Sequence, residues 1–389
     1  MTVRMLLRKV KLENLLSFRK TEVELRGLNV LIGANASGKS NLIEAIGLLQ
    51  AAPVDLSAGI RRLGGVHVVC SLAVPSPVAA IECDWINNEP LTYRLEFAEE
   101  AQSFVIQREI LNDRGADPEK TSAGTYFYRT SGKLMLGHAF PRAAGRSRGS
   151  TVDPTQSALA LSKSPADPTP ITRVGQEFGA IKIYRDFRTT GNSGARLGVS
   201  TSVPKTFLED GGDNLALVLQ EMDFKGLTEE VQTYLRRFSD RFKGVKTRLD
   251  GPFAKTHVEE SGLLEPLVSW RLSDGTLKFL CLLAVLLEPN PAPLICIEEP
   301  EVGLHPDAIQ IVAEALVDAS ERTQLIVTTH SQALIDALSD RPEDVLVTDR
   351  DFDNGTRFRR LRKRQLSDWL ERYSLGQIWR KGEIGGNRW

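Results

Sequence analysis

The chain has 389 residues, of which 41% are hydrophobic and 25% are charged, and its formal net charge is −1. This length allows one large domain or two moderate ones, and the composition is that of an ordinary globular protein. A net charge near zero gives the whole molecule no field that would attract nucleic acid. The longest apolar run is too short to cross a bilayer and no signal peptide is recognisable, so we expect a cytoplasmic protein without membrane contact.

The four cysteines show neither CxxC nor Cys/His metal spacing. At least two of them lie in predicted core segments. We therefore expect reduced thiols and neither a disulfide framework nor a zinc site.

The first 50 residues predict three strands followed by a helix. Alternating apolar residues indicate strands at residues 6–13 and 21–25, and a continuous apolar run indicates a buried strand at Leu28–Ile32. Helical spacing runs from residue 41 to residue 49. Residues 33–40 therefore form the turn from the buried strand into the helix.

That turn reads GANASGKS and has the form GxxxxGK[ST]. Its backbone N–H groups would cradle phosphate oxygens, Lys39 would reach the β- and γ-phosphates, and the Ser40 hydroxyl would ligand Mg²⁺. A glycine-rich turn that binds nothing is the alternative, which the flanking strand and helix disfavour. The sequence thus predicts an ATP site formed by Gly33, Ala34, Asn35, Ala36, Ser37, Gly38, Lys39, Ser40 and Asn41.

The middle of the chain predicts further strands and two helices. Alternating patterns indicate an antiparallel group of strands at residues 66–74, 78–85, 91–97 and 104–111. Residues 116–150 are rich in Gly, Ser, Arg and Thr, so a long loop is expected there. Apolar positions at helical spacing between residues 214 and 243 predict two helices.

Two adjacent acids, Glu298 and Glu299, follow a short apolar run at residues 294–297. In P-loop enzymes such a pair ends a buried strand: the first acid holds the Mg²⁺ shell and the second polarises the attacking water. We assign these roles to Glu298 and Glu299. The first acid is usually Asp, so Glu298 is a departure, and an exposed acidic turn before Pro300 is the alternative.

Two further segments complete an order found in ABC-type ATPases. Residues 272–276, LSDGT, precede an apolar helix and resemble the LSGGQ signature, while a strand at residues 324–329 ends at His330, which resembles the switch histidine. Taken alone, a Ser-Asp-Gly segment is commonly a helix-capping turn, and a single histidine is commonly structural. Here the phosphate loop, signature, acid pair and histidine follow one another along the chain in the order found in ABC-type ATPases.

This resemblance implies a mechanism. In ABC-type heads the signature serine and the following helix N-terminus bind the γ-phosphate of a nucleotide held by another subunit. ATP would therefore join two copies, with Ser273 and Gly275 acting across the interface. His330 would contact the γ-phosphate and Glu299 would orient water. Gln156 is the candidate for the glutamine that senses Mg²⁺ and nucleotide in such heads, with an ordinary surface residue as the alternative.

The resemblance narrows to RecF-, SMC- and OLD-like ATPases. It is carried by NLLSFRKTEVEL at residues 14–25, by the GxNxSGKS form of the loop, by EEPEVGLHP at residues 298–306, and by the tail SLGQIWRKGEIGGNRW at residues 374–389. It implies an α/β P-loop NTPase of the ABC-ATPase head type, with a mixed sheet, an antiparallel β-subdomain and a helical lobe. Residues 303–306 stand where ABC-type heads usually have the sequence SALD, and they depart from it. The chain has no sustained heptad repeat that would indicate coiled-coil arms.

We expect a single ABC-type head over residues 1–389. Its nucleotide-binding lobe would comprise residues 1–115 and 265–350, and residues 116–264 would form an inserted helical and signature lobe. A basic tail would follow at residues 351–389.

Three functions fit these features. The first is an ATP-dimerised head that acts on DNA in repair or in defence against foreign DNA. Basic stretches at residues 120–205 and 357–364 could follow phosphates, with a solvated face or loop as the alternative for each. The second is an ATPase that gates a separate effector protein such as a nuclease. The third is an OLD-like nuclease, disfavoured because about sixty residues after His330 are few for a TOPRIM domain. The acids Asp349, Asp351 and Asp353 read more simply as a polar turn.

Overall fold

The computed structural model describes residues 5–70, 74–75, 77–85, 90–115, 124–130, 132–136, 150–161 and 169–386. The chain forms two compact units. The phosphate-loop unit comprises Arg4–Ile181, Leu346–Leu361 and Ile384–Trp389, and the signature unit comprises Met1–Val3, Lys182–Val345 and Arg362–Glu383. Strands and helices between residues 124 and 181 pack with the preceding strands in the phosphate-loop unit. The expected lobe boundaries stay a prediction.

The phosphate-loop unit is built on a sheet whose strands follow the order β3-β17-β18-β2-β1-β4-β5-β6-β7-β8-β9. From β17 outward the neighbouring strands pair antiparallel. Alternating side chains face the core, as in β5, where Leu91, Tyr93, Leu95 and Phe97 are buried. The strands are β1 (Leu7–Leu15), β2 (Phe18–Glu24), β3 (Leu28–Ile32), β4 (Ala79–Trp85), β5 (Leu91–Glu100), β6 (Ser103–Asp113), β7 (Thr125–Thr130), β8 (Lys133–Leu136), β9 (Ser150–Thr151), β17 (Val345–Asp351) and β18 (Gly355–Arg360).

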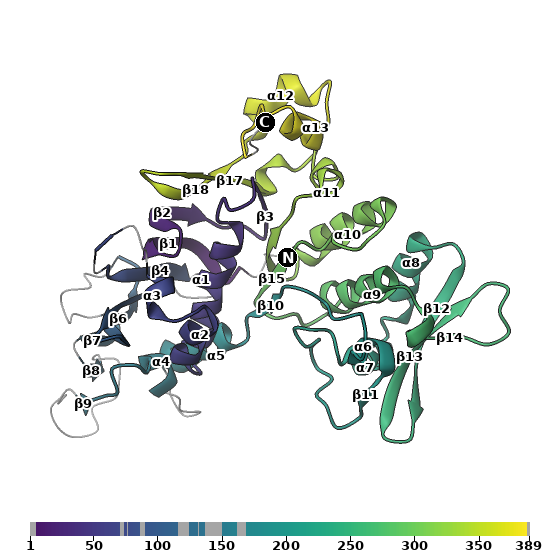
Figure 1. Ribbon diagram of the computed structural model, residues 1–389, viewed down its shortest axis with the longest axis horizontal. Coiled ribbons are helices and arrows are strands. Elements are labelled where there is room, and N and C mark those ends of the chain that lie inside the picture. The colour runs from purple at the N-terminus through teal and green to yellow at the C-terminus, as the bar shows by residue number, and fades with distance from the viewer. Residues whose placement is uncertain are drawn as a thin grey trace. The chain divides into compact units, whose positions relative to one another are not determined.

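Helices accompany this sheet (Figure 1). They are α1 (Lys39–Ala51), α2 (Leu56–Arg62), α3 (Val66–Val69), α4 (Ala158–Leu161) and α5 (Pro170–Gly179). Most of α1 is buried, which suits a helix that follows a fully buried strand. The indole of Trp85 donates to the Glu177 carboxylate of α5 over 2.9 Å, so α5 is fixed to β4 by a polar contact as well as by packing.

Two expectations in this unit were wrong. Residues 66–69 form the short helix α3 where a strand was expected, after Gly64 and Gly65 turn the chain with positive φ, and Cys70 makes only an isolated bridge to Leu15. The expected long loop contains the hairpin β7–β8. Residues 71–73, 116–123, 131 and 137–149 of these two segments lie outside the described residues.

The signature unit contains three parallel strands in the order β10-β15-β16 and a smaller antiparallel sheet. The parallel strands are β10 (Lys182–Tyr184), β15 (Leu294–Glu298) and β16 (Gln324–Thr328). The small sheet consists of β11 (Val199–Ser200), β12 (Phe242–Asp250), β13 (Phe253–Glu260) and β14 (Leu267–Val268). The helices are α6 (Gly194–Leu197), α7 (Leu215–Phe224), α8 (Thr228–Phe238), α9 (Asp274–Leu286), α10 (Pro306–Ala319), α11 (Gln332–Asp336), α12 (Lys363–Leu370) and α13 (Leu375–Arg380).

Helix α9 forms the centre of the signature unit. It is apolar on all sides and nearly every residue from Thr276 onward is buried, as expected of a helix enclosed by other elements. The Phe279 ring of α9 stacks on Phe238 of α8 with centroids 4.3 Å apart. The two helices predicted between residues 214 and 243 are confirmed as α7 and α8.

All four cysteines are free and buried. Burial raises the pKa of the Cys70 thiol to about 11, and it raises the pKa of the other three thiols further. Such thiols are poor nucleophiles and poor metal ligands. Within the described ranges, no helix is long and apolar enough to cross a membrane.

Candidate nucleotide-binding and hydrolysis site

The phosphate-loop unit carries the predicted loop at the junction of β3 and α1. Lys39 is the first residue of α1 and is 94% buried, with only 6% of its surface exposed. Its ammonium group donates to the carbonyl oxygens of Gly33 and Ala34 over 2.9 and 3.0 Å. The ammonium therefore lies within the curve of the loop, where charge-assisted contacts to phosphate oxygens would form.

Two glycines allow the loop its close packing. A Cβ on Gly33 would clash with the Thr348 carbonyl oxygen, and a Cβ on Gly38 would clash with the Thr356 side chain. Gly38 also has φ +104°, a conformation that side chains disfavour. The backbone at both positions requires glycine.

A polar brace supports the loop from behind. The Thr356 hydroxyl donates to the Ser37 carbonyl over 2.8 Å and lies 2.8 Å from the Ser17 hydroxyl. The Asn41 amide, predicted to contact nucleotide, donates to that Ser17 hydroxyl over 2.6 Å. Sequence reasoning missed Ser17 and Thr356, because no local pattern joins residues 339 positions apart.

The loop fits a nucleotide phosphate in one further respect. The Ser37 hydroxyl is buried and has no hydrogen-bond partner within the described structure. A buried hydroxyl without a partner is uncommon, and a phosphate oxygen would supply the missing acceptor. Loop, ammonium and hydroxyl together suit the triphosphate of ATP.

The acid pair lies at one edge of the signature unit. Strands β15 and β16 run parallel with Glu298 paired to Thr328, so their carboxyl ends are level. Arg185, just after β10, donates from Nε to Oε1 of Glu298 over 3.2 Å. Sequence reasoning missed Arg185, whose place beside the acid follows from the order of the strands.

Glu299 and His330 meet at the same edge. Glu299 has φ +45°, and its N–H donates to the Thr328 carbonyl over 3.0 Å, which fixes this unusual backbone conformation. Its carboxylate oxygen lies 3.8 Å from Nε2 of His330. The structure thus brings Glu298, Glu299 and His330 together, as the sequence predicts.

A third acid, Glu301, contacts the residues that follow β16. One carboxylate oxygen of Glu301 accepts three hydrogen bonds, from the Thr329 hydroxyl over 2.7 Å and from the N–H groups of His330 and Ser331 over 2.8 and 3.1 Å. The other oxygen is buried without a hydrogen-bond partner in the described structure. Glu301 was not among the predicted site residues.

The signature turn begins α9. The Ser273 hydroxyl caps the helix by accepting the Thr276 N–H over 3.1 Å. Arg196 holds the turn in place with four contacts of 2.6 to 3.0 Å, to the carbonyls of Thr189, Trp270 and Leu272 and to the carboxylate of Asp274. Asp274 stands where the LSGGQ pattern has glycine, and the Arg196 cation offsets its charge.

The signature helix also packs on the turn that follows the acid pair. A Cβ on Gly275 would lie 2.9 Å from the Gly303 carbonyl oxygen, so a larger residue would force the two segments apart. The Lys278 ammonium donates to the Val302 carbonyl over 3.4 Å. Signature and acid edge are therefore in direct contact within one unit.

Gln156 lies in the phosphate-loop unit, in the turn before α4. The side chain of Gln156 is exposed, and its carbonyl accepts a hydrogen bond from the buried Arg129. In this unit Arg129 also faces the buried carboxylate of Glu109 at 3.8 Å. The assignment of Gln156 to metal and nucleotide stays a prediction.

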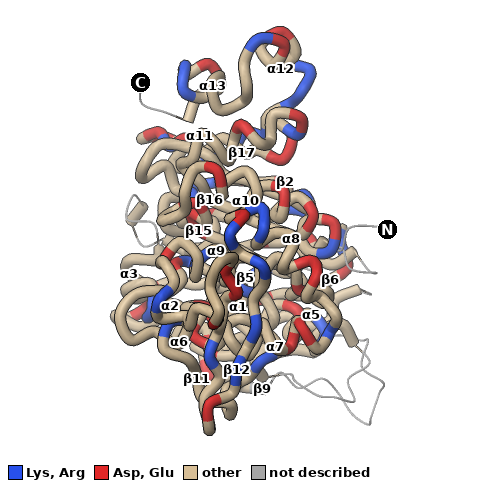
Figure 2. The backbone as a smooth tube through the Cα atoms, turned by 90° about the vertical axis from the view of Figure 1, so that its right-hand side faces the viewer, with Lys and Arg blue, Asp and Glu red and all other residues tan. Residues whose placement is uncertain are grey.

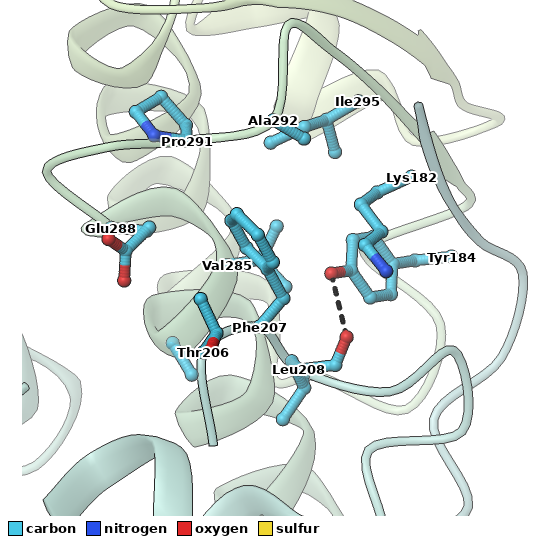
Figure 3. Close-up of a pocket in the computed structure, with 11 residues that line it drawn as sticks. Lys182, Tyr184, Thr206, Phe207, Leu208, Val285, Glu288, Pro291, Ala292 and Ile295 are labelled. Carbon is cyan, nitrogen blue, oxygen red and sulfur yellow. Dashed lines mark hydrogen bonds between the residues drawn. The ribbon is translucent and has the colours of Figure 1, made fainter. Parts of the chain in front are cut away.

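The signature unit also contains a small pocket, which none of the predicted site residues lines (Figure 3). Lys182 and Ile295 line it and are register partners on β10 and β15, three residues before Arg185 and Glu298, which is about 10 Å along a strand. Inside it the Tyr184 hydroxyl donates to the Leu208 carbonyl over 3.0 Å. The lining is mainly apolar, with Glu288 bound by Lys225.

Comparisons with known proteins agree with this geometry. A family model described as "AAA ATPase domain" matches residues 5–106, and one described as "AAA domain, putative AbiEii toxin, Type IV TA system" matches residues 215–336. The chain is 21% identical over 378 residues to an ATP/GTP phosphatase of Helicobacter pylori, covering 90% of this chain and 91% of that protein. It is 25% identical over 362 residues to the Old nuclease of Escherichia phage P2, covering 87% of this chain but only 58% of that nuclease.

Solved structures show the same fold. An Smc head domain with an extended coiled coil bound to the C-terminal domain of ScpA, derived from Pyrococcus furiosus, has a TM-score of 0.55 at 13% identity over 94% of this chain and 98% of that one. An SmcHead bound to the C-winged helix domain of ScpA has a TM-score of 0.51, also at 13% identity, over 92% of this chain and 99% of that one.

Fold and matched domains define a P-loop ATPase with the ABC-type head fold. Within that class, the resemblance to SMC/RecF-like ATPases of the OLD type is confirmed by the two ATPase models, the Old nuclease relative and the Smc head neighbours. The chain is an ATPase.

Proposed function

We propose that this chain binds Mg·ATP at residues 33–40, hydrolyses it with Glu299 as the water-orienting carboxylate, and dimerises when ATP is bound. The observation that carries the proposal is the convergence of Glu298, Glu299 and His330 at the ends of two adjacent parallel strands. Those ends are where open α/β sheets bind their ligands.

The loop residues have defined tasks in this proposal. Lys39 would exchange its contacts with the Gly33 and Ala34 carbonyls for stronger ones with phosphate oxygens. Ser40 and Glu298 would hold Mg²⁺, which neutralises charge on the phosphates when bound. Both residue types are oxygen donors suited to that ion.

The catalytic residues act by position. Glu299 would accept a hydrogen bond from the attacking water and hold it in line, and His330 would donate to the γ-phosphate. The hydrogen bond from the Glu299 N–H to Thr328 supports this role, because it fixes the carboxylate close to the histidine.

Dimerisation is proposed through the signature turn. Ser273 and the N-terminus of α9 present N–H groups and a helix dipole suited to an anion. In a symmetric pair each copy would offer this turn to the nucleotide held by the other, so the contact is isologous. The fold shared with Smc heads supports this arrangement.

The biological proposal is action on DNA, in repair or in defence against foreign DNA. The Old nuclease relative supports it. Figure 2 shows Lys and Arg interspersed with Asp and Glu along the described chain, and on the small sheet Lys246 and Lys255 are paired with Glu259 and Asp250. Any DNA contact would therefore use local clusters of Lys and Arg. The dependence of DNA affinity on salt concentration would then be a sensitive test of such contacts.

Gating of a separate effector, such as a nuclease, is the second candidate. In this proposal the effector would carry the nuclease chemistry, and this chain would supply ATP-dependent gating. The Asp351 carboxylate accepts hydrogen bonds from the Asn354 N–H and side-chain amide, which supports the interpretation of this acidic segment as a polar turn.

One experiment separates these proposals. ATP hydrolysis by the purified protein is measured with and without duplex or single-stranded DNA, alongside plasmid cleavage in Mg²⁺ and Mn²⁺. DNA-stimulated hydrolysis without cleavage supports the first proposal, hydrolysis indifferent to DNA supports an effector, and metal-dependent cleavage by the wild type that is absent from a Glu299→Gln preparation contradicts both.

A further inference from the structure

We infer that Glu301 is a positioning residue, which sets the place of His330 beside Glu299 and ties it to the segment on which the signature helix packs. The inference rests on the proposed role of His330 in hydrolysis. It concerns a residue two positions beyond the acid pair, in the turn at residues 299–304.

The contacts of Glu301 fix the histidine through its backbone. The three donors to its carboxylate come from three consecutive residues, Thr329, His330 and Ser331. The Ser331 N–H is additionally held by the Thr329 hydroxyl over 2.9 Å. These bonds hold the backbone of His330 in place before any ligand arrives, and the ring lies 3.8 Å from the Glu299 carboxylate.

The turn that carries Glu301 is itself rigid. The Val302 N–H donates to the Glu299 carbonyl over 3.1 Å, and the Leu304 N–H donates to the Glu301 carbonyl over 3.0 Å. Glu299 and Glu301 therefore move as one piece. A single turn thus fixes the water-orienting carboxylate and the support of the histidine.

The same turn contacts α9. Lys278 donates to the Val302 carbonyl, and Gly275 packs against the Gly303 carbonyl. A continuous set of contacts therefore runs from the signature helix through the turn at residues 299–304 to His330. A displacement of α9 by a second copy would reach the histidine through Glu301, which makes Glu301 the link between dimer closure and hydrolysis.

A carboxylate suits this task better than a shorter acceptor. One oxygen with a full share of negative charge can accept three donors at once, and hydrogen bonds to charged groups are the stronger kind. The second oxygen is buried and lacks a hydrogen-bond partner within the described residues, which is a cost of burying a carboxylate here. Glutamine keeps an acceptor oxygen at the same reach, whereas alanine removes the support.

The test compares Glu301→Ala, Glu301→Gln and the exposed control Glu321→Ala. Binding of a non-hydrolysable ATP analogue is measured at equilibrium and hydrolysis in a single turnover. We expect Glu301→Ala to bind the analogue within about twofold of wild type and to hydrolyse ATP about 100-fold more slowly, because misplacing a catalytic group by an ångström has that effect. Glu301→Gln recovers part of the rate, and the control matches wild type.

A double variant shows whether Glu301 acts through His330. If it does, Glu301→Ala slows the His330→Ala protein no further, because the group it positions is already gone. The labelled imidazole signal of His330, assigned by its absence in His330→Ala, shifts in Glu301→Ala and returns toward the wild-type position in Glu301→Gln. A merely structural defect would slow both backgrounds equally.

The outcomes separate the two claims. A slow His330→Ala protein beside a fully active Glu301→Ala protein overturns this inference alone. Rate losses that multiply in the double variant do the same. A His330→Ala protein as active as wild type overturns the proposed role of His330 and the inference with it.

Discussion

The guanidinium of Arg185 bonds the carboxylate of Glu298, with Nε and Oε1 3.2 Å apart. The two residues end adjacent parallel strands, so the pairing is a direct consequence of the sheet order. Glu298 is the acid proposed for Mg²⁺, and a metal ion must therefore displace the guanidinium or share the carboxylate with it. The arginine is 37% exposed, which limits the strength of the pair.

Replacing Arg185 by Met should strengthen Mg²⁺ binding. The lost ion pair is worth at most about 1 kcal/mol, so we expect the Mg²⁺ concentration for half-maximal nucleotide binding to fall roughly two- to fivefold. Arg188→Met, which breaks the more exposed pair with Asp213, serves as control and should leave it unchanged. An unaltered Mg²⁺ requirement in Arg185→Met would show that Glu298 does not hold the metal.

Lys39→Ala should abolish nucleotide binding at ordinary concentrations. Losing charge-assisted contacts costs roughly 1.5–3 kcal/mol each, so affinity drops by at least 10- to 100-fold. The exposed Lys20→Ala protein is a control of equal charge. Titration of a fluorescent ATP analogue measures both, and wild-type affinity in Lys39→Ala would remove the phosphate-loop assignment.

Ser273→Arg should leave nucleotide binding to the monomer nearly intact while blocking ATP-driven dimerisation and hydrolysis. The large cation would fill the turn that is proposed to face a second copy. Mixing this variant with Lys39→Ala should restore at most one composite site per pair. Light scattering and hydrolysis rates of each variant and of the mixture check this, and normal dimerisation of Ser273→Arg would exclude the ABC-type arrangement.

Breaking the buried pair in the phosphate-loop unit should destabilise the fold. Glu109 accepts from Tyr93 and Ser157 and faces Arg129, and both members of the pair have fully buried side chains. Removing one member of such a pair costs about 3–5 kcal/mol. Urea unfolding of Glu109→Leu should show this loss, and the Glu109→Leu/Arg129→Met double variant should recover part of it. No recovery would mean that the hydrogen bonds of Glu109, and not its pairing, carry the stability.

Much of the fold follows from sequence patterns. Continuous apolar runs located β3, β15 and β16, and helical spacing located α1, α7 and α8. The alternation of apolar and polar residues that predicted a strand at residues 66–74 is also compatible with a turn of helix at Val66–Val69, which begins directly after the positive-φ residues Gly64 and Gly65. The hairpin β7–β8 was missed because its strands are short and lie among Gly- and Ser-rich residues.

The residues of the candidate site also fall into two groups, those that the sequence could indicate and those that only the structure shows. Residues in contiguous motifs, such as Lys39 and Glu299, could be proposed from the sequence because each motif carries its own chemistry. Arg185, Arg196 and Glu301 could not, because their roles arise from strand order and from contacts between distant segments. No local pattern distinguishes Arg185 and Arg196 from surface charges, and the motif at residues 298–306 does not show what the Glu301 carboxylate contacts.

The most direct test of ATP-driven dimerisation with hydrolysis by Glu299 is light scattering of the Glu299→Gln protein with Mg·ATP. This variant keeps every proposed binding group and lacks the carboxylate that orients water. We expect stable dimers that form only with nucleotide, together with hydrolysis slowed at least about 100-fold. Monomers at saturating Mg·ATP, or hydrolysis at the wild-type rate, would contradict it.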